Sequence, residues 1–371
     1  MELLEWHREQ QEAKLSGRYI TLQDIEPLLK QYEDNGEVSV IGRSVNKDTI
    51  YMYRTGQGPK KVLMWSQMHG NESTTTKAVM DLLKFLKEEN AVARRILEQC
   101  TLYIIPMLNP DGARAYTRVN AVNIDLNRDA ADISQPESFA LRRVFDEIAP
   151  DFCFNLHDQR TIFNTGDSPK PATLSFLSPA TNKERSITPP RKKSMEVIAA
   201  VNTVLQRHIP GQVGRYDDSF NINCVGDSFQ TLGVPTLLFE AGHYPEDYNR
   251  DMTRQYVFRA LLAALQYVAD HPVSGEGYEA YFDIPENGKQ FFDILIREFP
   301  ITIAGEVVLK DIGILYKEEL RDCKIVFTPY IEEIGDLQGF YGHKTYSASE
   351  KTLPSIEEKN LETSTLLKLF L

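Results

Sequence analysis

The chain has 371 residues, of which 42% are hydrophobic and 25% are charged, and its formal net charge is −12. This length is compatible with about two domains, and the acidic excess disfavours nucleic acid as a partner. The sequence has no run of about 18 apolar residues, so we predict no membrane-spanning helix.

The first third of the chain predicts a helix followed by strands. The N-terminal ten residues are charged and lack the apolar core of a secretory signal, which predicts a cytoplasmic protein. A helix is predicted over residues 21–33, where Thr21 or Asp24 can cap the first turn. Strands are predicted near residues 37–42 and 49–54. The short connection between them indicates an antiparallel pair.

A buried strand over residues 62–68 runs directly into His69 and Glu72. An imidazole and a carboxylate three positions apart form a candidate metal site, because open α/β sheets bind ligands at the carboxyl ends of their strands. Zn²⁺ is commonly held in hydrolases by two His and one Glu. A third ligand must therefore come from elsewhere. The chain has a second His-x-x-Glu pattern at His243 and Glu246, and we interpret His243 as a structural or supporting residue.

Other polar segments also follow predicted strands. Residues 109–112 follow the strand 102–107, and residues 152–156 lead into His157. Helices are predicted near residues 73–90, 136–148, 191–208 and 252–270. The alternation of strands and helices predicts an α/β fold with a mixed β-sheet flanked by helices.

Together these segments resemble the zinc carboxypeptidase family of the carboxypeptidase A type (M14 metallopeptidases), over roughly residues 18–270. The resemblance rests on several motifs in the family's order rather than on one motif. It implies a single bound zinc ion with His69, Glu72 and His157 as ligands. It also implies that Glu240, which ends the apolar run 234–239, is the catalytic glutamate.

The resemblance assigns further roles to residues 118–128. Arg118, nine positions before Asn127, matches the arginine that polarises the scissile carbonyl, and Asn127 and Arg128 match the pair that grips the substrate's terminal carboxylate. The chemistry fits these residue types. Glu240 can carry a proton from the attacking water to the leaving nitrogen, and a guanidinium can hold a carboxylate through two parallel hydrogen bonds. The predicted function is zinc-dependent hydrolysis of a C-terminal peptide bond.

Substrate selection is predicted to involve residues 211–233, which occupy the family's specificity-loop region. Tyr216 is the first candidate for the family's substrate-capping tyrosine, with Tyr244 and Tyr248 as competitors. Asp227 either lines the side-chain pocket, where it would favour a basic or amine-bearing terminal residue, or is an ordinary turn residue. The Pro-, Ser- and Thr-rich stretch between His157 and Arg191 is expected to wall the cleft.

Two other functions fit the same residues. The chain could deacylate N-acyl amino acids, as the related succinylglutamate desuccinylase and aspartoacylase group does, so the expected substrate is a peptide or an N-acyl amino acid. It could also be a catalytically silent binding protein on the same fold. The retained ligand set, with Arg118 and Glu240, favours the enzyme.

The C-terminal part of the chain carries a different pattern. Short apolar stretches separated by charged residues predict a small β-rich domain over residues 274–371, after a catalytic domain over residues 1–273. We expect the last segment, residues 363–371, to be a short docking helix or a frayed tail. The four Cys lack CxxC spacing and are expected to be free buried thiols. The basic cluster of residues 191–193 is expected to be a solvated helix start.

Overall fold

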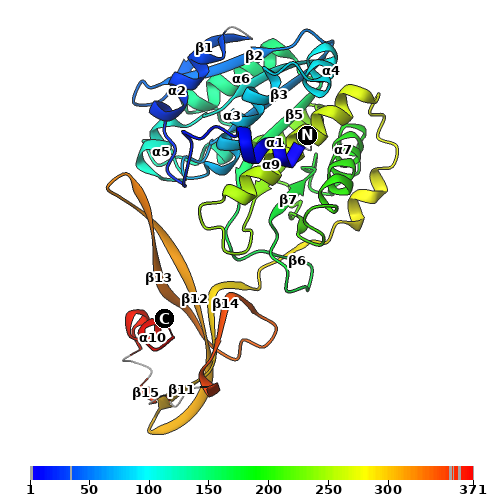
Figure 1. Ribbon diagram of the computed structural model, residues 1–371. Helices are drawn as coiled ribbons and strands as arrows, with labels where there is room; N and C mark the ends of the chain where they lie inside the picture. The colour runs from blue at the N-terminus through cyan, green and yellow to red at the C-terminus, as the bar shows by residue number, and fades with distance from the viewer. Residues whose placement is uncertain (1–2, 34–35, 351–352, 354, 358–360, 371) are drawn as a thin grey trace.

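The computed structural model describes residues 3–33, 36–350, 353, 355–357 and 361–370. Figure 1 shows a large α/β portion and a β-rich C-terminal region that extends away from it. This confirms the predicted mixed α/β fold with a C-terminal β-rich part. None of the described helices combines the length and apolar character that crossing a membrane requires.

The main sheet has eight strands in the order β1-β2-β4-β3-β5-β9-β7-β8. Its centre is parallel, because β3 pairs in parallel with both β4 and β5, and β5 pairs in parallel with β9. The β1–β2 pair is antiparallel, as the short connection predicts. The bounds are β1 Glu37–Arg43, β2 Thr49–Thr55, β3 Lys60–Ser66, β4 Cys100–Ile105, β5 Phe152–Asp158, β7 Leu174–Leu177, β8 Val213–Arg215 and β9 Thr236–Ala241.

Helices cover both faces of this sheet and enclose two apolar cores (Figure 1). Strand β3 feeds both cores, because Val62 and Met64 point into one and Leu63 and Trp65 into the other. The helices of the larger core are α1 Leu3–Gln10, α2 Leu22–Gln31, α3 Thr74–Leu86, α4 Ala91–Gln99, α7 Pro189–Leu205 and α9 Asp251–Asp270. Those of the smaller core are α6 Pro136–Ile148 and α8 Val225–Thr231.

The helix predicted over residues 73–90 ends early, because α3 stops at Leu86; after a break, a separate helix α4 begins at Ala91, beyond the predicted range. The break has a local cause, because the side chain of Asn90 accepts a hydrogen bond of 2.8 Å from the backbone N–H of Ala93 and so caps the start of α4. The other predicted helices lie within a few residues of α2, α6, α7 and α9.

The segment between His157 and Arg191 is more ordered than its composition suggests, because it contains β6 (Asn164–Thr165) and β7. Strand β6 pairs with β10 (Asn287–Gly288). The expectation that residues 191–193 form a solvated helix start is wrong for Arg191. Its side chain is buried, donates to the carbonyl oxygen of Arg185 at 2.6 Å and is ion-paired with Asp218.

The C-terminal region is a five-stranded sheet in which β11–β14 form the order β13-β12-β11-β14 and β15 pairs with β11. Its strands are longer than the short apolar stretches predict, because charged residues continue the strands on exposed faces. The bounds are β11 Phe291–Ile303, β12 Glu306–Arg321, β13 Lys324–Gly335, β14 Tyr341–Ser347 and β15 Ile356–Glu357. Helix α10, Thr363–Phe370, docks through the buried Leu366, and Leu371 lies outside the described residues.

Two short helical turns, η2 (Leu126–Arg128) and η3 (Tyr278–Asp283), and the helix α5 (Pro110–Ala115) complete the large portion, and η4 (Ala348–Glu350) follows β14. The division into two domains at residue 273 stays a prediction. Tyr281 and Ile284, which follow it, pack in the larger core. The thiols of Cys100 and Cys153 are buried as expected, but Cys224 is half-buried and Cys323 is exposed.

Candidate metal centre and substrate cleft

The candidate ligands meet at the carboxyl ends of two neighbouring strands. His69 and Glu72 lie in the turn between β3 and α3, and His157 lies near the end of β5. Nδ1 of His69 lies 2.8 Å from one oxygen of Glu72, and Nδ1 of His157 lies 2.9 Å from the other. All three side chains are buried, and their ligand atoms lie within 4.8 Å of one another.

This donor set fits a zinc ion. The Nδ1 atoms of His69 and His157 face each other at 3.1 Å, and both face the carboxylate of Glu72. Two imidazole nitrogens and one carboxylate match the ligand types of hydrolytic zinc sites. Burial opposes ionisation of Glu72, but the two histidines outweigh it and hold the pKa of that carboxyl well below its usual value. Glu72 is therefore a carboxylate at neutral pH, the form in which it could bind a metal ion.

Asp125 orients this centre, although the motif analysis assigned it no role. Its Oδ1 lies 3.1 Å from Nε2 of His69, and its Oδ2 accepts a 3.0 Å hydrogen bond from Nε of Arg118. Arg118 also reaches Glu72, with Nη1 3.3 Å from Oε1. A carboxylate on the far nitrogen of a ligating histidine fixes the ring's tautomer and orientation. Asp125 lies directly before η2 and two positions before Asn127. Its place within the segment 118–128 is the sequence feature from which a role at this site could have been predicted.

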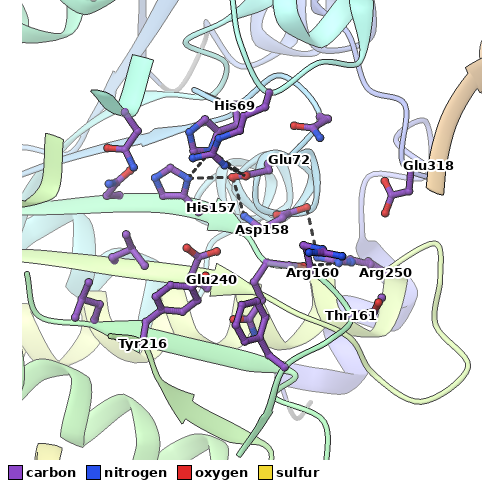
Figure 2. Close-up of a pocket in the computed structure, with 18 of the residues that line it drawn as sticks. His69, Glu72, His157, Asp158, Arg160, Thr161, Tyr216, Glu240, Arg250 and Glu318 are labelled. Atoms are coloured by element: carbon purple, nitrogen blue, oxygen red, sulfur yellow. Dashed lines mark hydrogen bonds and ion pairs between the residues drawn. The ribbon is translucent and has the colours of Figure 1, made fainter. Parts of the chain in front are cut away.

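Glu240 stands on β9, the strand next to β5, and is the register partner of His157. Side chains of paired residues in parallel strands point to the same face of a sheet, so both face the cavity; Figure 2 shows them together beside Glu72. Burial, with the nearby carboxylates of Glu72 and Asp158, raises the pKa of Glu240 well above its usual value. A carboxyl of this kind can hold a proton near neutral pH.

Asn127 and Arg128 are presented by the turn η2 and line the same cavity. The amide oxygen of Asn127 accepts from the backbone N–H of Val225 at 3.0 Å, which anchors η2 against α8. The guanidinium of Arg128 is exposed and donates to the backbone oxygen of Asn127 at 2.7 Å, and its Nη1 lies 3.1 Å from the thiol sulfur of Cys224. Arg128 therefore retains donors for a ligand.

Tyr216 and Asp227 also line the cavity. The ring of Tyr216 packs against Phe163, with centroids 5.4 Å apart, whereas the competitors Tyr244 and Tyr248 pack elsewhere, against Tyr256 and the C-terminal region respectively. Asp227 belongs to the helix α8 rather than to a turn. Burial raises its pKa to about 7.

His243 is a structural residue by its contacts. Its ring packs against Tyr248 and His343, with centroid distances of 4.7 and 4.1 Å, and among the described residues it belongs to no cluster of potential metal ligands. The second His-x-x-Glu pattern therefore does not form a second metal site in the described part of the chain.

The cavity has a volume of about 810 Å³ and is not made by the α/β portion alone. Sequence reasoning missed two groups of lining residues. One consists of buried arginines of the α/β portion, Arg18 and Arg250. The other comes from the C-terminal region and comprises Asp293, Leu315, Tyr316, Lys317, Glu318 and Tyr330. The stretch after His157 contributes Gln159, Arg160, Thr161, Phe163, Leu177 and Pro179, which agrees with the expectation that it walls the cleft.

Comparison with known proteins agrees with this geometry. Residues 21–148 match the sequence profile of the family described as zinc carboxypeptidase. The predicted resemblance to zinc carboxypeptidases is confirmed. Among curated proteins, probable carboxypeptidase 2 of Trichophyton verrucosum is 28% identical over 101 residues, or 27% of this chain and 20% of its own length. Carboxypeptidase SOL1 of Arabidopsis thaliana is 26% identical over 174 residues, or 41% of this chain and 35% of its own length.

Solved structures of metallo-carboxypeptidases share this zinc carboxypeptidase fold. The Burkholderia cenocepacia metallo-carboxypeptidase superposes with a TM-score of 0.55 at 20% identity and covers 68% of this chain and 69% of its own. The Pseudomonas aeruginosa metallo-carboxypeptidase, solved with (2-guanidinoethylmercapto)succinic acid, gives 0.54 at 18% identity and the same coverage. The chain matches only about a third or less of the length of the curated relatives, 34% and 20% for the first two.

Proposed function

We propose that the protein is a zinc-dependent carboxypeptidase that hydrolyses the C-terminal peptide bond of a peptide. The observation that carries the proposal is the convergence on one cavity of the His69, Glu72 and His157 cluster with Glu240, the in-register neighbour of His157. A zinc ion held by these three residues would polarise the scissile carbonyl and acidify water.

Glu240 is the proposed proton carrier. Its carboxylate takes a proton from the attacking water and returns it to the leaving nitrogen, and its raised pKa suits it to hold that proton between the two transfers. Arg118 donates to the oxygen on which negative charge develops. This donor is fixed in place, because its Nε is bonded to Asp125 at 3.0 Å.

Substrate recognition is proposed to begin at the free carboxylate. Arg128 holds it through its planar guanidinium, and Asn127 adds a donor. Tyr216 closes over the terminal residue, whose side chain extends towards Asp227. As the carboxylate, Asp227 favours a basic or amine-bearing side chain, and since its pKa is about 7 this preference strengthens as the pH rises through neutrality.

The test combines metal analysis with turnover. We expect one zinc per chain and hydrolysis of some members of a panel of C-terminal dipeptides and N-acyl amino acids. Glu240→Gln keeps the zinc but loses about 10²- to 10⁴-fold in kcat. Glu246→Gln, an exposed glutamate in the second His-x-x-Glu pattern, is the matched control and keeps full turnover.

The outcomes separate the alternatives. Turnover of N-acyl amino acids without turnover of peptides would replace the carboxypeptidase by a deacylase at the same site. Stoichiometric zinc without turnover of any substrate would favour a silent binding protein. Failure to bind zinc after reconstitution would refute the metal centre itself.

A further inference from the structure

The cavity continues past the metal site into a part walled by the C-terminal region. Figure 2 shows Tyr216 and Glu318 at opposite ends of the drawn site, with Glu240 and the metal ligands between them. If the terminal residue of the substrate lies beside Tyr216 and Asp227, as the proposed function requires, the part on the amino side of the scissile bond extends towards Arg160, Thr161 and Glu318.

Two carboxylates of this amino-side half, Glu318 and Asp293, are already bonded within the protein. Glu318 accepts from Arg18, with a separation of 3.0 Å, and from the hydroxyl of Tyr116. Asp293 accepts from the hydroxyl of Tyr248 at 2.9 Å and from the backbone N–H of Tyr316 at 2.7 Å. The oxygens of both carboxylates are therefore engaged by protein donors rather than presented to a substrate.

The buried arginine of this half is also occupied. Arg250 donates from Nη1 to the backbone oxygen of Ala241 and from Nη2 to that of Gln159, each at 2.5 Å, and its Nη1 lies 3.9 Å from Asp158. Its role is to tie the ends of β5 and β9 together.

Arg160 differs from these residues. It follows β5 by two positions, its side chain is exposed, and it lines the cavity. Within the described part of the chain it has no hydrogen bond or ion pair. Among the described lining residues the one exposed carboxylate, Asp217, is held by Ser219 through contacts of 2.9 to 3.1 Å. The C-terminal region adds a second exposed cation, Lys317, whose partner Glu319 lies two residues along its own strand at 3.1 Å.

We propose that Arg160, assisted by Lys317, forms a subsite for a carboxylate on the amino side of the scissile bond. The substrate class is then a short peptide or acyl amino acid with an acidic residue immediately before the bond that is cleaved. A planar guanidinium whose donors are not engaged by the protein can bind a carboxylate through two parallel hydrogen bonds. The inference rests on the proposed function for the direction in which the substrate lies.

The test compares matched substrates that differ only in this charge. N-acetyl-Glu and N-acetyl-Gln dipeptides with the same C-terminal Lys or Phe are assayed with the zinc-loaded protein. We expect kcat/KM to favour the Glu substrate by about 10- to 100-fold, as for a hydrogen bond to a charged group. Arg160→Gln removes most of this preference by slowing the Glu substrate far more than the Gln substrate. Arg160→Lys retains part of it.

Arg207→Gln is the matched control, because Arg207 is exposed and lies outside the cavity; it keeps the wild-type preference. Binding of the same dipeptides to Glu240→Gln, measured by calorimetry, gives a second readout that does not need turnover. Hydrolysis without a Glu preference overturns the subsite and leaves the carboxypeptidase standing. A Glu preference in binding without wild-type hydrolysis overturns the reaction and leaves the subsite. Absence of both binding and turnover overturns the subsite as well.

Discussion

Asp125 shows how much of the proposed metal centre depends on a residue outside the predicted ligand set. Its two oxygens bond Nε2 of His69 at 3.1 Å and Nε of Arg118 at 3.0 Å, so it fixes a proposed ligand and the proposed oxyanion donor together. Burial opposes its ionisation, but His69 and Arg118 lower the pKa of Asp125 overall. It is therefore anionic across the neutral range.

We predict that Asp125→Asn weakens zinc binding by about 10- to 100-fold, because the His69 ring loses its charged partner. Competition with a chelator measures this change. Asp132→Asn is the control, since Asp132 is exposed in the segment that follows η2. Unchanged zinc affinity in Asp125→Asn would show that packing alone positions His69.

At the scale of elements, a buried charge cluster joins three helices far apart in the sequence. Asp81 of α3 accepts from Nε2 of His7 in α1 at 2.8 Å and from Nε of Arg254 in α9 at 2.6 Å. The backbone N–H of Glu12 adds a further 2.8 Å bond. Asp81 and Arg254 are both buried, so neither charge has water as an alternative partner.

Asp81→Asn is predicted to destabilise the fold by about 3–5 kcal/mol, because it leaves the Arg254 charge buried without its counter-ion. Thermal or denaturant unfolding measures the loss. The control is Asp270→Asn, which breaks the Asp270–Arg95 pair; the two side chains are 44% and 50% exposed, and an exposed pair contributes about 0–1 kcal/mol. Equal losses in the two variants would contradict the argument.

The same cluster predicts a pH dependence. Burial raises the pKa of Asp81, but His7 and Arg254 outweigh it and lower the pKa below the usual aspartate value. The carboxylate therefore stabilises the folded chain fully above the unfolded pKa of about 4, and this contribution is lost as the pH falls through the lowered folded value. The free energy of unfolding of Asp81→Asn should therefore fall less between neutral and acidic pH than that of the wild type, and denaturant unfolding at a series of pH values measures the difference.

The elements that the sequence predicts best are those whose signal is local. The strand ends at His69, His157 and Glu240 follow from short apolar runs, and their meeting at one sheet edge follows from parallel pairing. Contacts between distant segments carry no local signal. The burial of Arg191, and the approach of β12 to the cleft, depend on tertiary packing and could not be deduced from periodicity.

At the scale of the whole molecule, the C-terminal region is tied to the α/β portion by polar contacts at several points. Nε2 of His343 lies 2.8 Å from the backbone oxygen of Thr161, the strand β10 pairs with β6, and Glu318 is bonded to Arg18 and Tyr116. Figure 1 shows the β12–β13 hairpin reaching up to the α/β portion near α5. The position of the cavity-lining residues of the C-terminal region therefore depends on the stability of these contacts.

A double-mutant cycle on Arg18 and Glu318 tests this dependence. The Arg18 side chain is 5% exposed and that of Glu318 is 26% exposed, so removing either partner leaves the other charge in a poorly hydrated position. We expect Arg18→Met and Glu318→Leu each to lower the unfolding temperature. The double variant should recover part of the loss, with a coupling energy of about 0.5–3 kcal/mol.

The exposed pair Arg95–Asp270 serves as the control cycle, because its side chains are 50% and 44% exposed and its coupling should be close to zero. Strictly additive losses at Arg18 and Glu318 would mean that the hairpin is held by its other contacts. A measured coupling would instead identify this ion pair as the link through which the C-terminal region keeps its residues at the cleft. Breaking this ion pair would then displace the cavity-lining residues of the C-terminal region, while the predicted metal ligands His69, Glu72 and His157 would stay in place.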